Sequence, residues 1–522
     1  MRTFFGEGNQ GHLRLGTRRS LLALSQSGWV ASEVARLNPG FTVELVGIDT
    51  RGDKVLDVPL TQVQGKEFFV AELDTALRSG EVDFSVHSMK DLSLDRPEDF
   101  VLAAVPKREN QRDIAIFSER VFERLRVGLP IRIGTSSPRR QENLPSFFEQ
   151  ALPHLAGKPH IQLVDLRGNV NTRLGRLQES ESSDRVLDGV VLAFAGMIRL
   201  WANETARLEM KSLLRGTRLM VLPLTHSPAA AAQGILAVEC RKDDEKVRSV
   251  LRTLHSPEAE RQAIQERAVL RKWGGGCHQR FGASAIHHPE FGGLLLVKGA
   301  ATGGKLLDEQ EWERAAPADS AATEVSAFDG TNWKGERTFL PSQSSSSVLS
   351  AGPCFVAHSA AVTESTRVPL LNSRIWTSGA TSWFKLAAQG LWVEGCAEGF
   401  GFDWLRGLIQ ESILELPEWG SSWSVVTHED ATETWGTAKV HATYRIGWSG
   451  AALERAAQAL RSATHVYWTS ASQWEALKDY VAPNAVQSCG PGKTAGRLRE
   501  KGLLPQVYPS PAHWRRALGL ES

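Results

Sequence analysis

The chain has 522 residues, of which 42% are hydrophobic and 23% charged, as is typical of a soluble globular protein with several domains. Its 60 Lys and Arg balance 59 Asp and Glu, and the net charge of +1 excludes a strongly basic nucleic-acid coat and an acidic disordered tail. Five cysteines, an odd and sparse number, argue against a disulfide scaffold and for a reducing compartment.

Short β-type runs alternate with helical stretches along the N-terminal part. Strands are predicted over Leu13–Thr17, Thr42–Ile48, Phe84–His87, Ile131–Gly134, Ile161–Leu166, Gly189–Ala193 and Ile235–Cys240. Helices are predicted over 19–37, 67–80, 169–180, 243–254 and 257–273. This alternation predicts an α/β fold with parallel sheets covered by helices on both faces. Because ligands bind beyond the carboxyl ends of such strands, functional side chains should follow strands directly.

The chain changes character further on. Two β-type runs, 281–286 and 294–301, predict a small α+β domain, and the serine-rich stretch 341–350 predicts a flexible linker. Trp376-Thr-Ser recurs later as Trp468-Thr-Ser, a weak repeat that predicts two related α/β lobes in 351–522, the second cut short by the chain end. We expect the linker to separate independent parts, so that a cut within 344–347 leaves the N-terminal part active.

Membrane and export signals are not apparent. No run of about 18 apolar residues occurs. The start of the chain lacks the basic region and apolar stretch of a signal peptide. We therefore expect a cytoplasmic protein.

Arginines just after predicted strands are the dominant functional pattern. Serine, threonine or glycine beside them begins a helix, where backbone N–H groups and the helix dipole favour an anion. The guanidinium adds a planar fork that suits carboxylate or phosphate. The pattern predicts a site for a ligand with many negative groups, formed by Arg18, Ser20, Thr135, Ser136, Ser137, Arg139, Arg140, Arg167, Arg173 and Arg199. The alternative is a set of surface arginines in weak ion pairs.

Lys90 and Asp91 follow the predicted strand Phe84–His87. The lysine charge keeps Asp91 ionised, which suits it to accept a hydrogen bond from an N–H donor or to stabilise a developing cation. Lone Lys-Asp pairs are common, so an ordinary surface pair is the alternative. His87 ends an apolar run, and we interpret it as a packed or hydrogen-bonded histidine.

Cys277 follows a glycine run on a predicted loop. A thiol exposed there suits a nucleophile or a covalent attachment point, and the alternative is an incidental loop cysteine. No second cysteine stands at metal-ligand spacing, so we expect no metal site. Cys240 lies in an apolar strand and is expected to be buried and unreactive.

Taken in order, these motifs resemble the hydroxymethylbilane synthase family, also called porphobilinogen deaminase, over about 12–340. The matching motifs are Gly16-Thr-Arg-Arg-Ser20, Thr50-Arg-Gly-Asp53, Gly65-Lys66, His87-Ser-Met-Lys-Asp91, Gly134-Thr-Ser-Ser-Pro-Arg-Arg-Gln141, Leu166-Arg-Gly-Asn-Val170, Gln233-Gly234, Glu239-Cys-Arg241 and Gly275-Gly-Cys277. The resemblance implies two periplasmic-binding-protein-like α/β lobes that face a cleft, and a small α+β domain that carries a cofactor. The implied ranges are 1–106 with 233–252, 107–232 and 253–340 respectively.

The resemblance also implies an activity in tetrapyrrole and haem biosynthesis. The family is a transferase that joins four porphobilinogen molecules head to tail, releases ammonia and frees the linear tetrapyrrole by hydrolysis. A dipyrromethane cofactor is implied, held by a thioether to Cys277 and bound by Thr135, Ser136, Ser137, Arg139 and Arg140. Asp91 and Lys90 are implied as catalytic, with Asp91 stabilising the cationic intermediate. The implied substrate-binding residues are Arg18, Ser20, Arg167, Arg173 and Arg199. The expected partner is the substrate porphobilinogen. We expect a monomer with no nucleic-acid or membrane partner.

Two stretches depart from the family pattern. His278-Gln-Arg280 follows the cysteine where the family usually has Val-Pro, and Pro228–Gly234 is one residue longer than usual. Both predict altered loop geometry near the cofactor, and neither removes a residue with a named chemical role.

The C-terminal part, 351–522, resembles uroporphyrinogen-III synthase. The similarity rests on the two Trp-Thr-Ser strand ends and on Cys489-Gly-Pro-Gly-Lys-Thr-Ala-Gly-Arg-Leu. It implies a bifunctional enzyme that also cyclises its product to uroporphyrinogen III, and a degenerate stabilising lobe is the alternative. A non-catalytic anion-binding protein on the same fold is a further alternative, and the balanced charge argues against a nucleic-acid binder.

Overall fold

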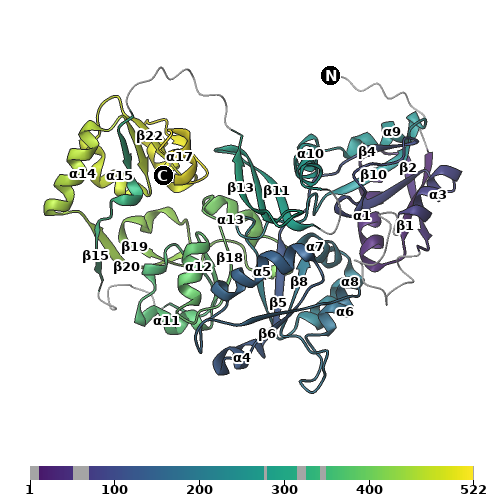
Figure 1. Ribbon diagram of the computed structural model, residues 1–522, viewed down its shortest axis with the longest axis horizontal. Coiled ribbons are helices and arrows are strands. Elements are labelled where there is room, and N and C mark those ends of the chain that lie inside the picture. The colour runs from purple at the N-terminus through teal and green to yellow at the C-terminus, as the bar shows by residue number, and fades with distance from the viewer. Residues whose placement is uncertain (1–10, 51–69, 275–278, 314–324, 341–348, 521–522) are drawn as a thin grey trace.

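The computed structural model describes residues 11–50, 70–274, 279–313, 325–340 and 349–520, which form five sheets (Figure 1). The first sheet has the order β2-β1-β3-β10-β4, and we call it with its helices the first lobe. Its strands are Gly11–Arg18 (β1), Phe41–Ile48 (β2), Phe84–Ser88 (β3), Phe100–Ala104 (β4) and Leu236–Arg241 (β10). Its helices are Leu21–Leu37 (α1), Ala71–Ser79 (α3) and Glu245–Leu251 (α9).

The second lobe is built on the sheet β7-β6-β8-β5-β9. Its strands are Asp113–Ser118 (β5), Ile131–Gly134 (β6), Ile161–Val164 (β7), Gly189–Ala193 (β8) and Thr217–Val221 (β9). Its helices are Val121–Val127 (α4), Pro138–Ala151 (α5), Val170–Gly175 (α6), Phe194–Ala202 (α7) and Glu204–Leu214 (α8). The chain enters this lobe through 105–112 and returns through 222–235, and we call these segments the first and second crossover.

Both sheets are mixed, whereas the alternation of elements predicts parallel ones. β10 runs antiparallel to β3 and β4, and β5 runs antiparallel to β8 and β9. Each of these strands is the first that the chain forms after a crossover, so no strand–helix–strand connection fixes its direction. Strands joined through helices, such as β1 with β2 and β6 with β7, are parallel as predicted.

The small domain lies between the lobes and the C-terminal part (Figure 1). It consists of helix Pro257–Lys272 (α10) and an antiparallel sheet of Arg280–His288 (β11), Gly292–Ala300 (β12) and Leu306–Trp312 (β13). β11 and β12 confirm the two runs predicted there. β13 was not predicted, because acidic residues interrupt its apolar pattern.

Two sheets form the C-terminal module, which we define as 325–340 with 349–520. The larger has the order β15-β20-β19-β16-β17-β18 and the smaller β14-β21-β22-β23. The strands are Ala327–Asp329 (β14), Glu336–Phe339 (β15), Pro353–Val356 (β16), Arg374–Thr377 (β17), Val393–Cys396 (β18), Ser424–His428 (β19), Lys439–Gly447 (β20), His465–Trp468 (β21), Val486–Cys489 (β22) and Gln506–Val507 (β23). The helices are Glu364–Leu371 (α11), Ala380–Ala387 (α12), Phe402–Ile409 (α13), Gly450–Ser462 (α14), Ala471–Leu477 (α15), Lys493–Glu500 (α16) and Pro511–Ala517 (α17). No described helix is long and apolar enough to cross a bilayer.

Strands β14 and β15 correct the expected boundary of this module. The expected range of the small domain, 253–340, includes both strands, but β14 pairs with β21 and β15 pairs with β20, both beyond the linker. These strands have three and four residues, which is too short to show a strand period in the sequence. In the second C-terminal lobe, β14 adds a strand from before the linker to the sheet of β21, β22 and β23.

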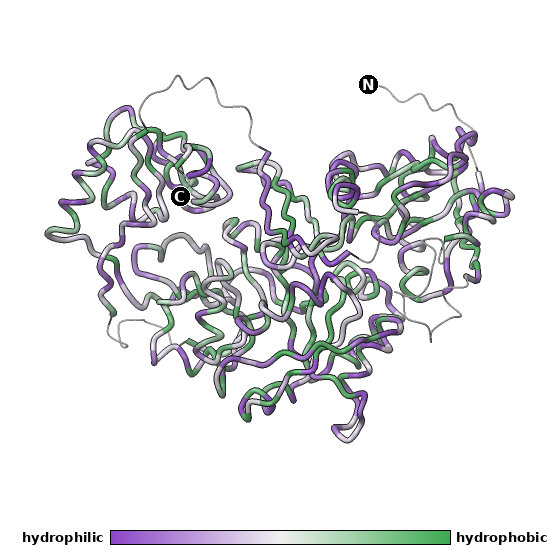
Figure 2. The backbone as a smooth tube through the Cα atoms, in the orientation of Figure 1, coloured by the Kyte–Doolittle hydropathy of each residue, from purple (hydrophilic) through white to green (hydrophobic). Residues whose placement is uncertain are grey.

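The C-terminal module shares two hydrophobic cores with the second lobe. One core contains Phe147 of α5 and Trp383 of α12, and Trp383 Nε1 also donates to Ala151 O at 3.0 Å. Trp392 packs edge-on against Phe117 at 5.4 Å between ring centroids. Hydrophobic stretches are prominent in the second lobe, whereas the C-terminal module mixes hydrophobic and hydrophilic stretches (Figure 2). The two units are therefore one folded body, which does not support the expectation of independent parts.

We predict that cutting the linker will not separate the chain. With a protease site inserted at 344–347, both fragments should elute together from size exclusion, because β14 and β15 pair with strands beyond the cut and the shared cores hold the rest. The same digest in denaturant should give two separate species. Separation under native conditions would contradict the shared core.

Candidate active site

Lys90 and Asp91 lie on a short 3₁₀ turn, Met89–Asp91, directly after β3 of the first lobe. Lys90 is half-buried and Asp91 is exposed. Burial lowers the pKa of Lys90, the charge of Asp91 opposes this shift, and the charge of Arg140 adds to it. The first-lobe turn therefore lies within electrostatic reach of arginines on the second lobe.

A buried carboxylate, Asp113, holds Arg139 and Arg140 together at the start of α5. Arg139 Nη2 donates to Asp113 Oδ2 at 2.7 Å, and Arg140 donates from Nε at 3.0 Å and from Nη2 at 2.7 Å. Gln233 Nε2 donates to the same carboxylate at 2.9 Å. Burial alone would raise the pKa of Asp113, but the charges of the two arginines hold it well below its usual range. Asp113 is therefore ionised and fixes both guanidinium groups.

This placement of Arg139 and Arg140 differs from the prediction that both are available to ligand carboxylates. Their side chains are only 3% and 8% exposed. Arg139 Nη1 also donates to Pro228 O, and Arg140 Nη1 donates to Val191 O, each at 2.8 Å. The buried Nε of Arg139 has no hydrogen-bond partner in the described part of the chain. Arg140 is thus committed to the protein, whereas Arg139 keeps one donor for a ligand.

The hydroxyl groups of Thr135, Ser136 and Ser137 lie on the loop after β6. Ser136 Oγ lies 2.8 Å from both the carbonyl and the amide of Leu166, which joins this loop to the one after β7. Thr135 Oγ1 accepts from the amide of Ser137 at 3.3 Å, at the residue where α5 begins. These residues therefore shape the loop that presents the two arginines.

Arg167 and Arg173 form a half-buried cluster of positive charge. Arg173 Nε donates to Gly168 O at 2.8 Å, and neither guanidinium has an acidic partner in the described residues. Burial and the charges of Arg140 and Arg167 lower the pKa of Arg173 to about 10. Gly168 has φ of +104°, and a Cβ there would lie 2.8 Å from Thr172, so this turn requires glycine. An anionic ligand would relieve the repulsion within the cluster.

Arg199 lies on α7, beside the second crossover. Its Nη2 donates to Gly234 O at 2.7 Å. Burial lowers the pKa of Arg199 to about 10, and the nearby charge of Glu109 on the first crossover opposes this shift. The structure thus places Arg199 against both crossovers, and its contact with substrate stays a prediction.

Arg18 and Ser20 lie where β1 leads into α1. Ser20 caps the helix, since its Oγ accepts from the amide of Ala23 at 3.3 Å. β1 and β3 run parallel, so Arg18 and Lys90 share the carboxyl edge of the first-lobe sheet. Both predicted residues therefore stand at the edge where a ligand of this lobe would bind.

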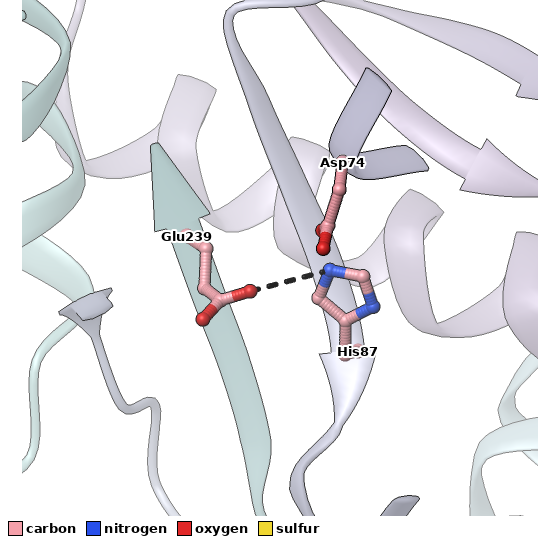
Figure 3. Close-up of side chains that lie close together, drawn as sticks. All are labelled: Asp74, His87 and Glu239. Atoms are coloured by element: carbon pink, nitrogen blue, oxygen red, sulfur yellow. Dashed lines mark ion pairs between the residues drawn. The ribbon is translucent and has the colours of Figure 1, made fainter. Parts of the chain in front are cut away.

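His87 is buried beneath this edge, in a cluster with Asp74 and Glu239 (Figure 3). Its Nε2 lies 2.9 Å from Ser85 Oγ and 3.6 Å from Glu239 Oε2. Burial lowers the pKa of His87 to about 4, so the ring is neutral near pH 7. The interpretation as a packed, hydrogen-bonded histidine is confirmed.

The cluster around His87 has the ligand types of a metal site, but a guanidinium takes the place of the cation. Arg96 Nη2 donates to Asp74 at 2.7 Å and to Glu239 at 2.8 Å, and Arg96 Nε donates to Glu239 at 3.0 Å. Two carboxylates therefore already share one positive charge. We interpret the cluster as a structural ion-pair network of the first lobe.

Cys277 lies outside the described residues, but the elements on either side of its segment contact both predicted loops. Arg267 of α10 donates to Ser93 O at 2.6 Å, just past the turn with Lys90 and Asp91. Arg280, the first residue of β11, donates from Nε to Glu142 of α5 at 3.0 Å. The chain leading into and out of this segment is thus fixed to both lobes.

Asp113 and Arg267 are not marked as site residues in the sequence, and Gln233 is marked only as part of the motif Gln233-Gly234, without a role. Asp113 begins the apolar strand Asp113–Ser118, and an acid at the start of such a run could have indicated a buried partner for arginines. Arg267 lies in α10, and no local pattern marks it.

The donor groups fit a covalently held pyrrole pair, because each pyrrole of the family's cofactor carries two carboxylates. Arg139 Nε is buried without a partner, and Arg167 makes no hydrogen bond or ion pair in the described residues. Unused cationic donors of this kind are matched by a polyanionic ligand. Cys240, by contrast, is buried, and burial raises the pKa of its thiol to about 11, as expected for an unreactive cysteine.

Comparison with known proteins gives relatives of the N-terminal part of the chain. The family model of the porphobilinogen deaminase dipyromethane cofactor binding domain matches residues 13–249. The porphobilinogen deaminase of Syntrophotalea carbinolica is 38% identical over 298 residues, which are 57% of this chain and 85% of that protein. The porphobilinogen deaminase of Geobacter metallireducens is 41% identical over 288 residues, which are 55% of this chain and 80% of that protein.

A solved structure of the BenM effector binding domain with benzoate is 12% identical and has a TM-score of 0.24, covering 49% of this chain and 92% of that one. A likeness at this TM-score carries no weight. The sequence relatives, matched over most of their length, decide the assignment: the chain belongs to the porphobilinogen deaminase family.

Proposed function

We propose that this chain is a hydroxymethylbilane synthase, which joins four porphobilinogen molecules with loss of ammonia and frees the linear tetrapyrrole by hydrolysis. The observation that carries the proposal is the half-buried cluster of Arg167 and Arg173 without acidic partners in the described residues. Each porphobilinogen brings two carboxylates, so the growing chain needs many cations around one acid. The relatives named porphobilinogen deaminase support the same reaction.

Arg167, Arg173 and Arg18 are proposed to hold substrate carboxylates. A charged hydrogen bond contributes about 1.5–3 kcal/mol, so several of them fix the ligand firmly. Arg139 would add its remaining Nε donor, while Asp113 keeps the rest of that guanidinium in place. The arginine forks orient the pyrrole rings, and they do not take part in bond making.

Asp91 is proposed as the catalytic carboxylate. It is exposed on its turn, and its negative charge can accept a pyrrole N–H hydrogen bond and stabilise the positive charge that develops as the C–N bond to ammonia breaks. Lys90, whose pKa burial lowers, releases a proton more readily than an exposed lysine and suits protonation of the leaving amino group.

Cys277 is proposed to hold the dipyrromethane cofactor through a thioether. When bound, the cofactor supplies the free pyrrole end to which the first substrate is joined. Ser136 joins the loop before Arg139 to Leu166, and Asp113 holds the Arg139 guanidinium, which would bind a carboxylate of the cofactor. Arg280, in the segment that departs from the family pattern, ties the following strand to Glu142.

The relatives favour an enzyme over a non-catalytic binding protein. Cyclisation of the product by the C-terminal module stays a prediction, because the family match ends at residue 249. Monomeric state and the expected absence of nucleic-acid and membrane partners are likewise predictions.

Asp91→Asn should fold normally and lose nearly all turnover of porphobilinogen, because it keeps the shape of the side chain but removes the charge that stabilises the transition state. Rate of bilane formation and melting temperature measure the two effects. Asp95→Asn, at an exposed carboxylate four residues on, is the matched control and should keep full activity. An Asp91→Asn enzyme with normal turnover would rule out the assigned role.

Cys277→Ser should yield protein without a bound pyrrole pair. Intact mass under denaturing conditions should show the two-pyrrole excess on the unsubstituted chain and its loss in the variant, because the serine hydroxyl is a much weaker nucleophile than a thiolate. Cys240→Ser should keep the excess. A modified Cys277→Ser chain would place the attachment elsewhere.

Arg167→Gln should lower kcat/KM for porphobilinogen by about ten- to a hundredfold, as expected for the loss of one charged hydrogen bond worth about 1.5–3 kcal/mol. The melting temperature should stay equal or rise, because the substitution relieves repulsion of Arg173. Arg126→Gln on α4 serves as the control for an exposed arginine. Loss of stability with unchanged kcat/KM would show that Arg167 is a structural residue.

A further inference from the structure

The C-terminal module reaches the two crossovers through one buried carboxylate. Glu398 follows β18, and its side chain is fully buried. Its Oε1 accepts from Arg112 Nε at 3.0 Å and from Arg112 Nη2. Its Oε2 accepts from the amide of Thr225 at 3.0 Å. Arg112 ends the first crossover and Thr225 lies in the second, so a single side chain joins the two segments that connect the lobes.

The surroundings of Glu398 hold it in an unfavourable backbone conformation. Its φ is +58°, a left-handed value that a non-glycine residue keeps only when neighbouring contacts fix it. The Arg112 side chain is 9% exposed, and its guanidinium lies 5.6 Å from the ring centroid of Trp404 on α13. Removing one partner of such a buried pair leaves an uncompensated charge.

Arg112 is followed directly by Asp113, the carboxylate that fixes Arg139 and Arg140. A displacement of Arg112 therefore moves the start of β5 and the anchor of both arginines. A second residue of the module, Glu411, lies near the same crossover: burial and the charge of Glu109 raise its pKa, and Asn110 lowers it. The module thus bonds to the first crossover at Arg112 and lies near it at Glu411, next to the substrate-binding groups.

We propose that Glu398 is a positioning residue for the deaminase reaction, by which the C-terminal module sets the separation of the two crossovers and the position of Asp113. The proposal rests on the proposed function. It assigns the module a role in the reaction of the N-terminal part, independent of any activity of its own. Glu398 lies outside the segment matched to the family model, so the role belongs to the module of this chain.

The test uses the full, cofactor-loaded chain with Glu398→Gln and, as matched control, Glu394→Gln. Glu394 lies on the same module in β18, is equally buried, and pairs with Arg374 of the module at 2.8 Å. Activity is expressed per cofactor-loaded chain, and amide hydrogen exchange is followed in peptides covering 106–112 and 222–234. Hydrogen exchange does not depend on turnover, so it tests the contact of Glu398 with the crossovers by itself. A wild-type chain that is inactive toward porphobilinogen would refute the proposed function, and the exchange result would still decide on this contact.

We expect Glu398→Gln to lower kcat by about ten- to a hundredfold with KM changed less than about threefold, because displacement of a positioned group by about 1 Å costs that much rate. Exchange in both crossover peptides should quicken, whereas Glu394→Gln should change neither. Wild-type kcat and exchange in Glu398→Gln would overturn the proposal, as would equal effects of both variants. If Glu398→Gln does not fold, Arg112→Lys takes its place, because it keeps the positive charge but loses the paired N–H donors of the guanidinium. The same changes in kcat and in hydrogen exchange are then expected, and their absence would overturn the proposal.

Discussion

The Asp113 carboxylate is the interaction on which the rest of the candidate site depends. It lies at the start of β5, fully buried, and accepts hydrogen bonds from Arg139, Arg140 and Gln233. A charge buried in this way is tolerated only because its partners are charged and well placed. Through these bonds it ties the second-lobe sheet to α5 and to the second crossover. The loops that present the candidate site are therefore set by one buried acid.

Much of the fold was predictable because apolar runs and helical periods are local signals. The first-lobe strand β1 and the second-lobe strands β6 and β8 lie at or near their predicted bounds. The direction of β5 and β10 was not predictable, since it depends on where the chain crosses between lobes. β14 escaped notice because three residues carry no period.

The candidate site was predictable as a set of residue types and less so as a set of contacts. Arginines after strands predict an anionic ligand, and the structure brings two of them, Arg167 and Arg173, close together. Asp113 holds Arg139 and Arg140, which come 26 and 27 residues later in the chain. This contact depends on tertiary packing, and no local sequence pattern indicates it. The sequence indicates Lys90 and Asp91 as a neighbouring pair but not how near they lie to the second lobe, because that distance depends on how the two lobes pack.

The pairing of β14 with β21 has a consequence for synthesis of the chain. Ser326, just before β14, bonds to Thr464, 138 residues later. At roughly 5–20 residues per second, a ribosome delivers the partner strand about 7–28 seconds after β14 emerges. During that interval the β14 segment has no partner strand, and the second lobe lacks the module residues that complete the two shared cores. Completion of the last sheet is therefore timed by translation of the C-terminus, and a stalled ribosome would leave the backbone groups of the β14 segment unpaired and open to other chains.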